Sequence, residues 1–388
     1  MAAEIKNLKK TSNRILKAIK SKERIIIYGD ADLDGVTSVI ILKESIKNLG
    51  GEIAAIYFPD REKEGYGISE KALGYLKKYA PALFLTLDCG IGNFKEIKIA
   101  KKLGFEVVLI EHHEILDKLP EANIIVDPKQ KGDKYPFKQF ATVGIIFRLA
   151  KLLLKEGMTE NLRKNFLELT AMATIADMMP RIDENEEMII EGLSFLKTSW
   201  RPGIQALFEL EAFESLTLLQ QVYKVNSLLN IRNIENGLPA AFRLLTAPKK
   251  EEAKELAEEL LEKGLQKRKR IKEITYEIEE KILGKEAEPI IFEGSSDWEL
   301  ILLGVAASIL SQKYQKPVFL YKREKEKSDG VVIESGSIRA PAGFNVVKAM
   351  KNCSEDLITY GGHPQAAGFR IANKNLKEFK ECLMDYFD

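Results

Sequence analysis

The residues with the clearest chemical potential are three aspartates in the segment YGDADLDGVTS, residues 28–38. Asp30, Asp32 and Asp34 alternate along the chain directly after the apolar run at 25–27. Carboxylates placed this close repel one another unless positive charge neutralises them, and carboxylate oxygens are the ligands that hard divalent cations prefer. The segment therefore predicts a divalent cation site at the end of a buried strand.

Two more polar clusters follow apolar runs further along the chain. Asp88 follows one run, and His112 and His113 follow another within the sequence EHHE. The chain has 3 histidines, and the third, His363, lies in a GGHP segment near the C-terminus. A lone histidine is most often a surface or core residue, but imidazole beside carboxylates is a ligand set that suits Mn²⁺ as well as Mg²⁺ or zinc. These clusters extend the predicted cation site.

The segment DADLDG also matches the start of an EF-hand calcium loop. That loop requires a glutamate at its twelfth position, which is Ile41 here, and a helix rather than a strand before it. The sequence therefore favours a site assembled from several loops.

The elements that position these clusters are short apolar runs alternating with helical patterns. The runs occupy residues 24–28, 52–58, 82–87, 106–110 and 123–126. Strands this apolar, separated by amphipathic helices, are typical of a parallel sheet covered on both faces, so we predict a doubly wound α/β fold. Ligands bind such sheets beyond the carboxyl ends of the strands, which is where the polar clusters lie.

The rest of the chain predicts a helical addition and a second α/β unit. Residues 137–200 have apolar positions three and four apart, as helices do. A charged helical pattern then runs from 248 to about 284, and shorter apolar runs follow it to the C-terminus. We predict a catalytic domain at 1–245, a connecting helix at 246–286 and a smaller α/β domain at 287–388.

Composition indicates an ordinary globular protein. The 388 residues include 59 basic and 58 acidic side chains, a balance that excludes a uniformly basic coat but permits a local basic patch. The 3 cysteines lie far apart and contain no CxxC pair, so we expect neither a disulfide framework nor a zinc knuckle. No apolar run is long enough for a membrane span, and the N-terminus does not resemble a signal peptide, so we expect a cytoplasmic protein.

Several motifs carry a resemblance to a known family. GDADLDGVTS, LDCGI, EHHE with a following VDPK, and IADMMP with DENEEMIIEGL resemble the four motifs of the DHH phosphoesterase superfamily, most closely its RecJ-type single-strand-specific exonucleases. LLGVAASILSQKYQKPVFLY, ESGSIRAPAGFN and YGGHPQAAGF resemble the DHHA1 domain that accompanies that catalytic domain. The resemblance covers residues from about 24 to 385.

The resemblance implies a phosphodiesterase site with two divalent cations, Mn²⁺ or Mg²⁺. It assigns the ligands to Asp32, Asp34, Asp88, His112 and Asp177, with Asp30 close by and possible as a further ligand. Asp88 is the expected bridging ligand, and His113 is expected to face the scissile phosphate. From the sequence alone, Asp177 resembles only the last residue of a buried helix.

In the second domain the resemblance implies contacts with the substrate. Gly361, Gly362 and His363 are expected to present backbone amides and imidazole to a phosphate, with Arg339 bonded to a phosphate oxygen. For either motif alone, a tight turn and a surface arginine remain equally compatible with the sequence. The expected partner is single-stranded nucleic acid, with DNA favoured, and a replication or repair protein is a further possible partner.

Two departures from the family pattern leave alternatives open. Glu111 stands where the third motif has Asp, and its extra methylene moves the carboxylate by about 1.5 Å, enough to change activity or metal preference. Ile309 replaces an arginine expected to hold a terminal phosphate, and we expect no additional oligonucleotide-binding barrel.

The first hypothesis is therefore a 5′ to 3′ single-strand exonuclease. The alternatives are a phosphodiesterase for short oligonucleotides, including oligoribonucleotides, or for cyclic dinucleotides, and a catalytically weak scaffold of a replication complex. A scaffold has no need of buried, repelling carboxylates, which argues against the last.

Overall fold

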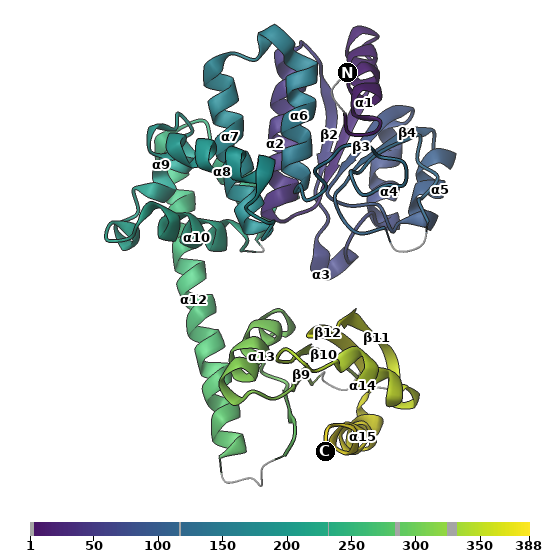
Figure 1. Ribbon diagram of the computed structural model, residues 1–388, viewed down its shortest axis with the longest axis vertical. Helices are drawn as coiled ribbons and strands as arrows, with labels where there is room; N and C mark the ends of the chain where they lie inside the picture. Colours follow the sequence, from purple (N-terminus) through teal and green to yellow (C-terminus); the bar gives the residue numbers. More distant parts are fainter. Residues whose placement is uncertain (1–3, 116–117, 232, 284–287, 324–331) are drawn as a thin grey trace. The chain divides into compact units, whose positions relative to one another are not determined.

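The protein consists of two compact units, which are described separately (Figure 1). The computed structural model describes residues 4–115, 118–231, 233–283, 288–323 and 332–388. The units are Met1–Gly264 and Leu265–Asp388, so the division falls within the long helix α12, Lys250–Ile282. The predicted end of the connecting helix at 284–286 and the predicted domain start at 287 lie outside the described residues.

The first unit is built on a parallel sheet in the order β2-β1-β3-β4-β5. Its strands are β1 (Ile25–Gly29), β2 (Ile53–Tyr57), β3 (Ala82–Leu87), β4 (Phe105–Ile110) and β5 (Ile124–Val126). The predicted doubly wound α/β class is confirmed. The order reverses between β1 and β3, and a sheet of this kind opens a crevice at that point, beyond the carboxyl ends of the strands.

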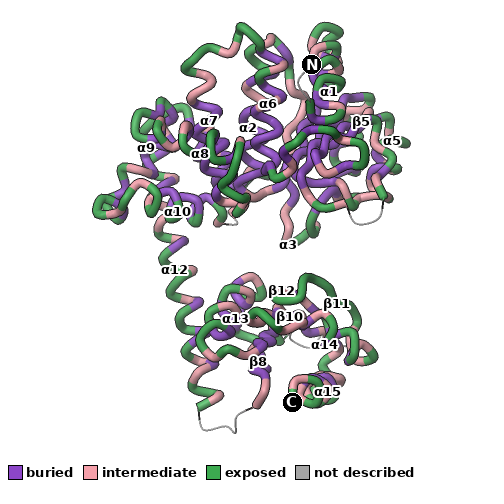
Figure 2. Tube along the Cα trace, in the orientation of Figure 1, coloured by how far each residue is buried: buried purple, intermediate pink, exposed green. Residues whose placement is uncertain are grey.

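Helices cover both faces of this sheet because its strands are apolar on both sides. In β1, Ile25 and Ile27 enter the larger core, while Ile26 and Tyr28 enter the smaller core on the opposite face. Figure 2 shows the middle of this sheet and the helices α2 and α6 mostly as buried segments, whereas the edge strand β2 is of intermediate burial. The larger core lies under α1 (Leu8–Lys20), α2 (Leu33–Asn48), α6 (Thr142–Leu154) and α7 (Glu160–Ala176); the smaller lies under α4 (Glu70–Leu76) and α5 (Phe94–Lys102).

The remaining elements of the first unit are mostly helical, as the apolar spacing predicts. They are α3 (Arg61–Glu64), α8 (Asp183–Phe195), α9 (Pro202–Phe208), α10 (Leu218–Leu229), the short strands β6 (Ile234–Glu235) and β7 (Leu238–Pro239), and α11 (Ala240–Leu245). Helices α7 and α8 pack against each other and α7 also packs on α2, so the predicted helical addition contributes to the larger core.

Glu168 of α7 is buried in this core, and this predicts a pH effect on stability. Its Oε2 accepts a 2.6 Å hydrogen bond from Ser199, and burial raises its pKa from 4.5 to about 7 despite that bond. Because the native protein holds this proton more tightly than the unfolded chain, its unfolding free energy falls as pH rises between 4.5 and 7.

We expect Glu168→Gln to stabilise the protein at pH 8 by about 1–3 kcal/mol and to have little effect near pH 4.5. Urea unfolding of both proteins at the two pH values measures the difference. An equal difference at both values would contradict the prediction.

The second unit contains a mixed sheet in the order β11-β12-β10-β9-β8. Its elements are β8 (Ile291–Ser295), α13 (Leu300–Tyr314), β9 (Val318–Lys322), β10 (Ile333–Arg339), α14 (Val346–Asn352), β11 (Leu357–His363), β12 (Ala366–Ala372) and α15 (Leu376–Phe387). Among the described strands of this sheet, only the pair β8 and β9 is parallel. Helix α13 and the end of α12 cover one face, and α14 and α15 cover the other.

The second unit corrects the expectation from cysteine spacing. Cys353 and Cys382 form a disulfide, with their Cα atoms 5.9 Å apart. They are 29 residues apart in sequence, and only the packing of α14 beside α15 brings them together. Cys89 is a buried free thiol.

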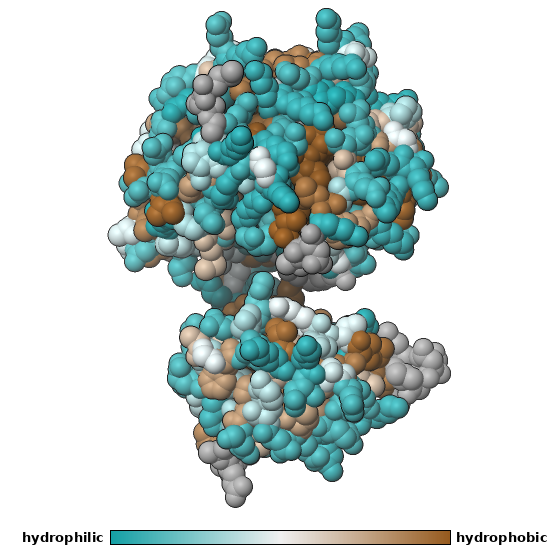
Figure 3. Space-filling model, turned by 45° about the vertical axis from the view of Figure 1, so that its right-hand side comes forward, coloured by the Kyte–Doolittle hydropathy of each residue, from teal (hydrophilic) through white to brown (hydrophobic). Residues whose placement is uncertain are grey.

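The surface is mostly hydrophilic in the view drawn. Hydrophilic side chains cover most of the visible face of each unit (Figure 3). Among the described residues, no helix combines the length and apolar character that a bilayer crossing requires.

Candidate metal centre

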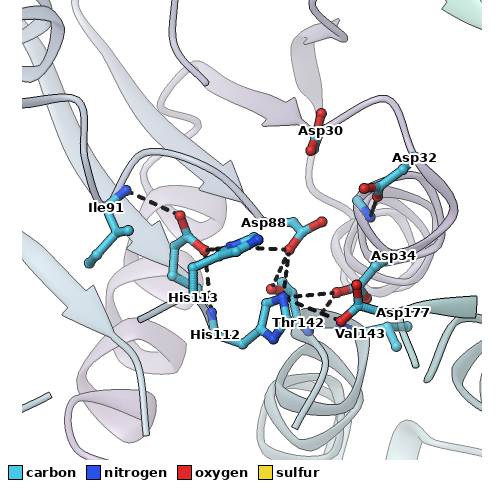
Figure 4. A network of polar contacts seen from close by, with 12 residues as sticks. Asp30, Asp32, Asp34, Asp88, Ile91, His112, His113, Thr142, Val143 and Asp177 are labelled. Carbon is cyan, nitrogen blue, oxygen red and sulfur yellow. Dashed lines mark hydrogen bonds and ion pairs between the residues drawn. The ribbon is translucent and has the colours of Figure 1, made fainter. Parts of the chain in front are cut away.

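The sequence-predicted acids and histidines meet beyond the carboxyl ends of the strands of the first unit (Figure 4). Asp30 directly follows β1, Asp88 follows β3, and His112 comes two residues after β4. Asp32 is the N-cap of α2, and Asp34 lies in the first turn of that helix. Asp177 ends α7 as its C-cap, so a helix distant in sequence completes the cluster.

The backbone conformation of the loops after β1 and β3 places the side chains of the cluster. A Cβ atom at Gly35 would lie 2.4 Å from the carbonyl oxygen of Asp30, so only glycine permits the turn from β1 into α2. Asp88 has a φ of 62°, in the left-handed region that non-glycine residues rarely adopt. A residue held in this conformation at a strand end is typical of a functional site.

His112 lies at the centre of the cluster. Its Nε2 atom is 3.3 Å from Asp88 Oδ1, 3.5 Å from Asp177 Oδ2 and 3.9 Å from Asp34 Oδ2. Ligand atoms about 2.1 Å from one cation are separated from neighbouring ligands by about 3 Å in octahedral geometry. The observed separations are therefore close to those of a coordination shell.

The polar atoms of the cluster fit a cation, because several are buried without a hydrogen bond. Both ring nitrogens of His112 and Oδ2 of Asp177 have no hydrogen-bond partner within the described part of the chain. The Phe140 backbone lies near enough to His112 to act in the direction of a higher His112 pKa. The donor set of carboxylates and imidazole suits Mn²⁺ or Mg²⁺. Asp88 belongs to two of the three groups of potential ligand atoms that lie within 4.8 Å of one another.

The pKa values of the cluster reflect burial first and repulsion between neighbouring groups second. Burial and the neighbouring carboxylates raise the pKa of Asp88 and of Asp34 well above the usual value. Burial, followed by the charge of Asp32, raises the pKa of Asp177 to about 6. Burial, followed by the charge of His113, lowers the pKa of His112 to about 4, which leaves a neutral imidazole able to ligate.

Asp34 has a second role in the fold. Helix α6 starts after Ala141, which provides no side-chain cap. Instead, the backbone amides of Thr142 and Val143 donate to Asp34, both over 2.8 Å. The Thr142 hydroxyl also donates to Asp88 Oδ1 over 3.1 Å. The start of α6 thus orients two of the predicted ligands.

Arg61 is a residue of this cluster that the sequence reasoning missed. Its Nε atom donates to Asp30 Oδ1 over 2.7 Å, and its Nη2 atom contacts Asp30 Oδ2 and donates to Asp32 Oδ2 over 2.9 Å. The guanidinium therefore offsets part of the repulsion among the aspartates. The available signal was its position just after β2, at the same edge of the sheet.

Glu111 acts through hydrogen bonds. Its fully buried carboxylate accepts from the Ile91 amide over 3.1 Å, from the His112 amide over 3.3 Å and from His113 Nδ1 over 2.8 Å. Burial alone would lower the pKa of His113, but this hydrogen bond and the charge of Glu111 outweigh it and raise the pKa. His113 remains 42% exposed beside the cluster, 3.9 Å from Asp88.

We expect Glu111→Asp to lower the kcat of a Mn²⁺-dependent reaction at this site about tenfold. The shorter side chain retracts the carboxylate by about 1.5 Å, so it cannot keep its bonds to Ile91 and His113 together. Because Glu111 positions His113, the Mn²⁺ concentration for half-maximal rate should change less than threefold. Steady-state kinetics over a Mn²⁺ titration measures both quantities, and unchanged kcat would show that the longer side chain is neutral.

The predicted contact residues of the second unit lie at one end of its sheet. In register, Ala366 pairs with Arg339 on one side and with His363 on the other. Residues directly opposite each other in a sheet project from the same face, so Arg339 and His363 share a face. Gly361 and Gly362 lie in the same exposed edge strand, and Gly362 has a φ of 137°.

Arg339 borders a pocket of about 420 Å³ within the second unit. Its guanidinium donates to the Ile338 carbonyl over 2.7 Å and lies against Gly304 of α13. The pocket is lined by Ser308, Ser311, Gln312, Gln315, Arg339, Ala340, Pro341, Ala342, Gln365 and Ala366. Ile309, which replaces the expected arginine, is 45% exposed on α13. The pocket thus has one cationic side chain among hydroxyl and amide groups.

Two models of known families match this chain. Residues 24–174 match the family model "DHH family, N-terminal domain", and residues 287–388 match "DHHA1 domain". The chain is thus similar to the DHH family in its first unit and to DHHA1 domains in its second.

Its similarity to individual proteins extends over almost the whole chain. It is 35% identical over 395 residues to the single-stranded-DNA-specific exonuclease RecJ of Bacillus subtilis, covering 99% of this chain and 48% of that protein. The chain therefore spans about half the length of this relative. It is also similar to a crystal structure of exonuclease RecJ bound to manganese, with a TM-score of 0.82, 25% identity, and 99% of this chain and 94% of that one covered. A RecJ structure with Mn²⁺ from Thermus thermophilus shares the fold, with a TM-score of 0.81, 23% identity, and 100% of this chain and 55% of that one covered.

Proposed function

We propose that the protein is a metal-dependent exonuclease that hydrolyses single-stranded DNA from the 5′ end. The observation that carries this proposal is the cluster of buried Asp34, Asp88 and His112 with partly buried Asp177. Its imidazole lies among three carboxylates and has no hydrogen bond within the described residues. The similarity to relatives named as single-stranded-DNA-specific exonucleases supports the choice of substrate.

The cluster residues would hold two divalent cations, Mn²⁺ or Mg²⁺. One cation would be bound by Asp34, His112 and Asp177. The other would be bound by Asp32, with Asp30 close enough to join it. Asp88 would contact both cations. When bound, such cations activate water and stabilise the departing oxygen of a phosphodiester. His113, held by Glu111 and partly exposed, would donate a hydrogen bond to the scissile phosphate.

The pocket beside Arg61 would bind the terminal phosphate of the substrate strand. Arg61 borders this pocket of about 440 Å³ within the first unit, with Asp32, Asn230 and Asn233 among the other residues of its wall. Cations bound to Asp30 and Asp32 would compete with Arg61 for these carboxylates, and a guanidinium binds phosphate oxygens in the same forked geometry. The pocket then offers the Arg61 guanidinium and the side-chain amides of Asn230 and Asn233 to the first nucleotide.

In the second unit, Arg339, Gly361, Gly362 and His363 would contact the phosphates of the same strand. The support is their position on one end of the sheet and the pocket beside Arg339. We also propose that the protein acts in the cytoplasm, in repair or replication, where a protein partner is possible.

The test is digestion of end-labelled single strands of several lengths in Mn²⁺. Stepwise release of mononucleotides from the 5′ end of long strands is the expected result, and its absence in EDTA the expected metal dependence. Asp385→Asn, an exposed aspartate of α15, is the matched control for changes in the cluster.

The same assay separates the other two functions. Ile309, in place of a phosphate-binding arginine, favours short substrates as the second candidate, and that function predicts cleavage confined to two- to five-residue oligonucleotides or cyclic dinucleotides. A scaffold predicts no metal-dependent product from any of these. Either outcome would replace the proposed exonuclease.

A further inference from the structure

The first unit carries a surface of exposed lysines outside the candidate metal centre. We call it the lysine surface. It consists of Lys6, Lys9, Lys10, Lys17, Lys20, Lys131 and Lys134, all of them exposed. Because the whole chain carries 59 basic and 58 acidic residues, such a surface reflects segregation of charge rather than an excess.

Helix α1 aligns most of these lysines in one stripe. Residues of a helix advance by about 100° each, so Lys9, Lys10, Lys17 and Lys20 fall within an arc of about 100° and span about 16 Å along the axis. The helix contains no acidic residue. Its opposite face, with Leu8, Ile15 and Ala18, is buried in the larger core. The stripe is therefore fixed in place and has no apolar face free to enter a membrane.

Loop 127–141 continues the stripe with Lys131 and Lys134. The Lys6 amide donates to Asp133 over 2.6 Å, and Lys6 Nζ donates to the Lys131 carbonyl over 2.9 Å, which joins the start of α1 to this loop. Both acids of the loop, Asp127 and Asp133, have buried side chains. The loop thus adds no exposed negative charge to the stripe.

Arg14 of α1 pairs with two acids beside the stripe and offsets one of their two negative charges. Arg14 pairs with Glu23 over 2.5 Å and with Glu106 over 2.8 Å. Within the described part of the chain, the side chains of Lys9, Lys10, Lys17, Lys20 and Lys134 make no ion pair. Unpaired lysines in a row attract a polyanion and release its counterions on contact.

The loop also leads from the lysine surface to the metal centre. It begins directly after β5, at the carboxyl edge of the sheet, and leads into Thr142 of α6, whose amide donates to Asp34. A polyanion lying on the lysine surface would therefore continue toward the edge where the candidate ligands meet.

We propose that the lysine surface binds the phosphate backbone of the nucleic-acid substrate beyond the nucleotides held at the metal centre. The choice of nucleic acid as the polyanion rests on the proposed function. The recognised chemistry is a phosphodiester backbone, from a single strand or from a duplex that flanks it. This contact would strengthen the grip on long substrates.

The test measures binding of a fluorescein-labelled 30-residue oligo(dT), and of a 30-base-pair duplex, by anisotropy in EDTA at several KCl concentrations. The variant is Lys9→Gln/Lys10→Gln/Lys17→Gln. The matched control, Lys71→Gln/Lys77→Gln/Lys102→Gln, removes three exposed lysines from the α4 and α5 side of the sheet. A further variant, Lys9→Arg/Lys10→Arg/Lys17→Arg, keeps the charge.

We expect the glutamine variant to bind at least about tenfold more weakly at 0.1 M salt, and the slope of log affinity against log salt to flatten by about 2 for the single strand. The control and the arginine variant should bind like wild type. Equal binding by both glutamine variants would overturn the inference, as would lysine-dependent binding of phosphatidylserine vesicles without binding of either nucleic acid. Hydrolysis in Mn²⁺ by wild type is scored separately, so failure of the proposed function is distinguishable.

Discussion

Asp88→Asn is expected to abolish hydrolysis and, in the absence of metal, to make the protein more stable. Loss of the shared carboxylate should lower the Mn²⁺-dependent rate by about a thousandfold or more, equivalent to about 4 kcal/mol of barrier. Asparagine tolerates the left-handed backbone that Asp88 adopts, and its amide oxygen can still accept from Thr142. The loss should therefore reflect cation binding rather than a changed loop.

The gain in stability follows from the charge of the cluster. Burial and the carboxylates of Asp34 and Asp32 raise the pKa of Asp88, so its charged form opposes folding at neutral pH when no cation is present. Removing that charge should raise the unfolding free energy by roughly 1–3 kcal/mol. Thermal unfolding in EDTA measures this as an increase in Tm of several degrees.

Adding Mn²⁺ should reverse the order of stability. Wild type gains about 2.7 kcal/mol when the ion is present at a hundred times its Kd, and the variant should gain little. The control Asp385→Asn should follow wild type in rate and in both melts. A variant that keeps most of its activity, or one that Mn²⁺ stabilises as much as wild type, would refute Asp88 as a shared ligand.

Asp34→Ala is expected to lose activity equally but to destabilise the protein. It leaves the Thr142 and Val143 amides at the start of α6 without their acceptor, and each buried unsatisfied amide costs about 1–3 kcal/mol. Relief of repulsion within the cluster offsets part of this cost. The expected net loss is about 2–4 kcal/mol, which corresponds to a Tm lower by roughly 5–15 °C.

Asp177→Ala provides the matched comparison. Asp177 Oδ2 accepts no hydrogen bond within the described residues, so this variant should lose activity without the loss of stability. Melting both variants in EDTA separates the two roles of Asp34. Equal Tm values for the two would mean that Asp34 does not support the start of α6.

The sequence alone determined the parallel sheet and most of the candidate site. Five apolar runs of strand length, each ending in polar residues, are a local pattern, and the rule that ligands bind at the carboxyl edge converts that pattern into a site. Asp30, Asp32, Asp34, Asp88 and His112 all follow strands, so their convergence could be expected from their positions along the chain.

Several residues and contacts could not be predicted from local sequence patterns, because they depend on tertiary packing. Asp177 ends a helix, and only the packing of α7 on α2 brings it within 3.5 Å of His112. The contacts of Arg61, the bond from Ile91 to Glu111 and the Cys353–Cys382 pair likewise depend on contacts between segments distant in sequence. The lysine spacing in α1 is visible in the sequence. Whether these lysines are free to bind an anion depends on the ion pairs that Arg14 makes with neighbouring acids. The sequence does not show those pairs, because the interaction of two charges depends on their distance in space and not along the chain.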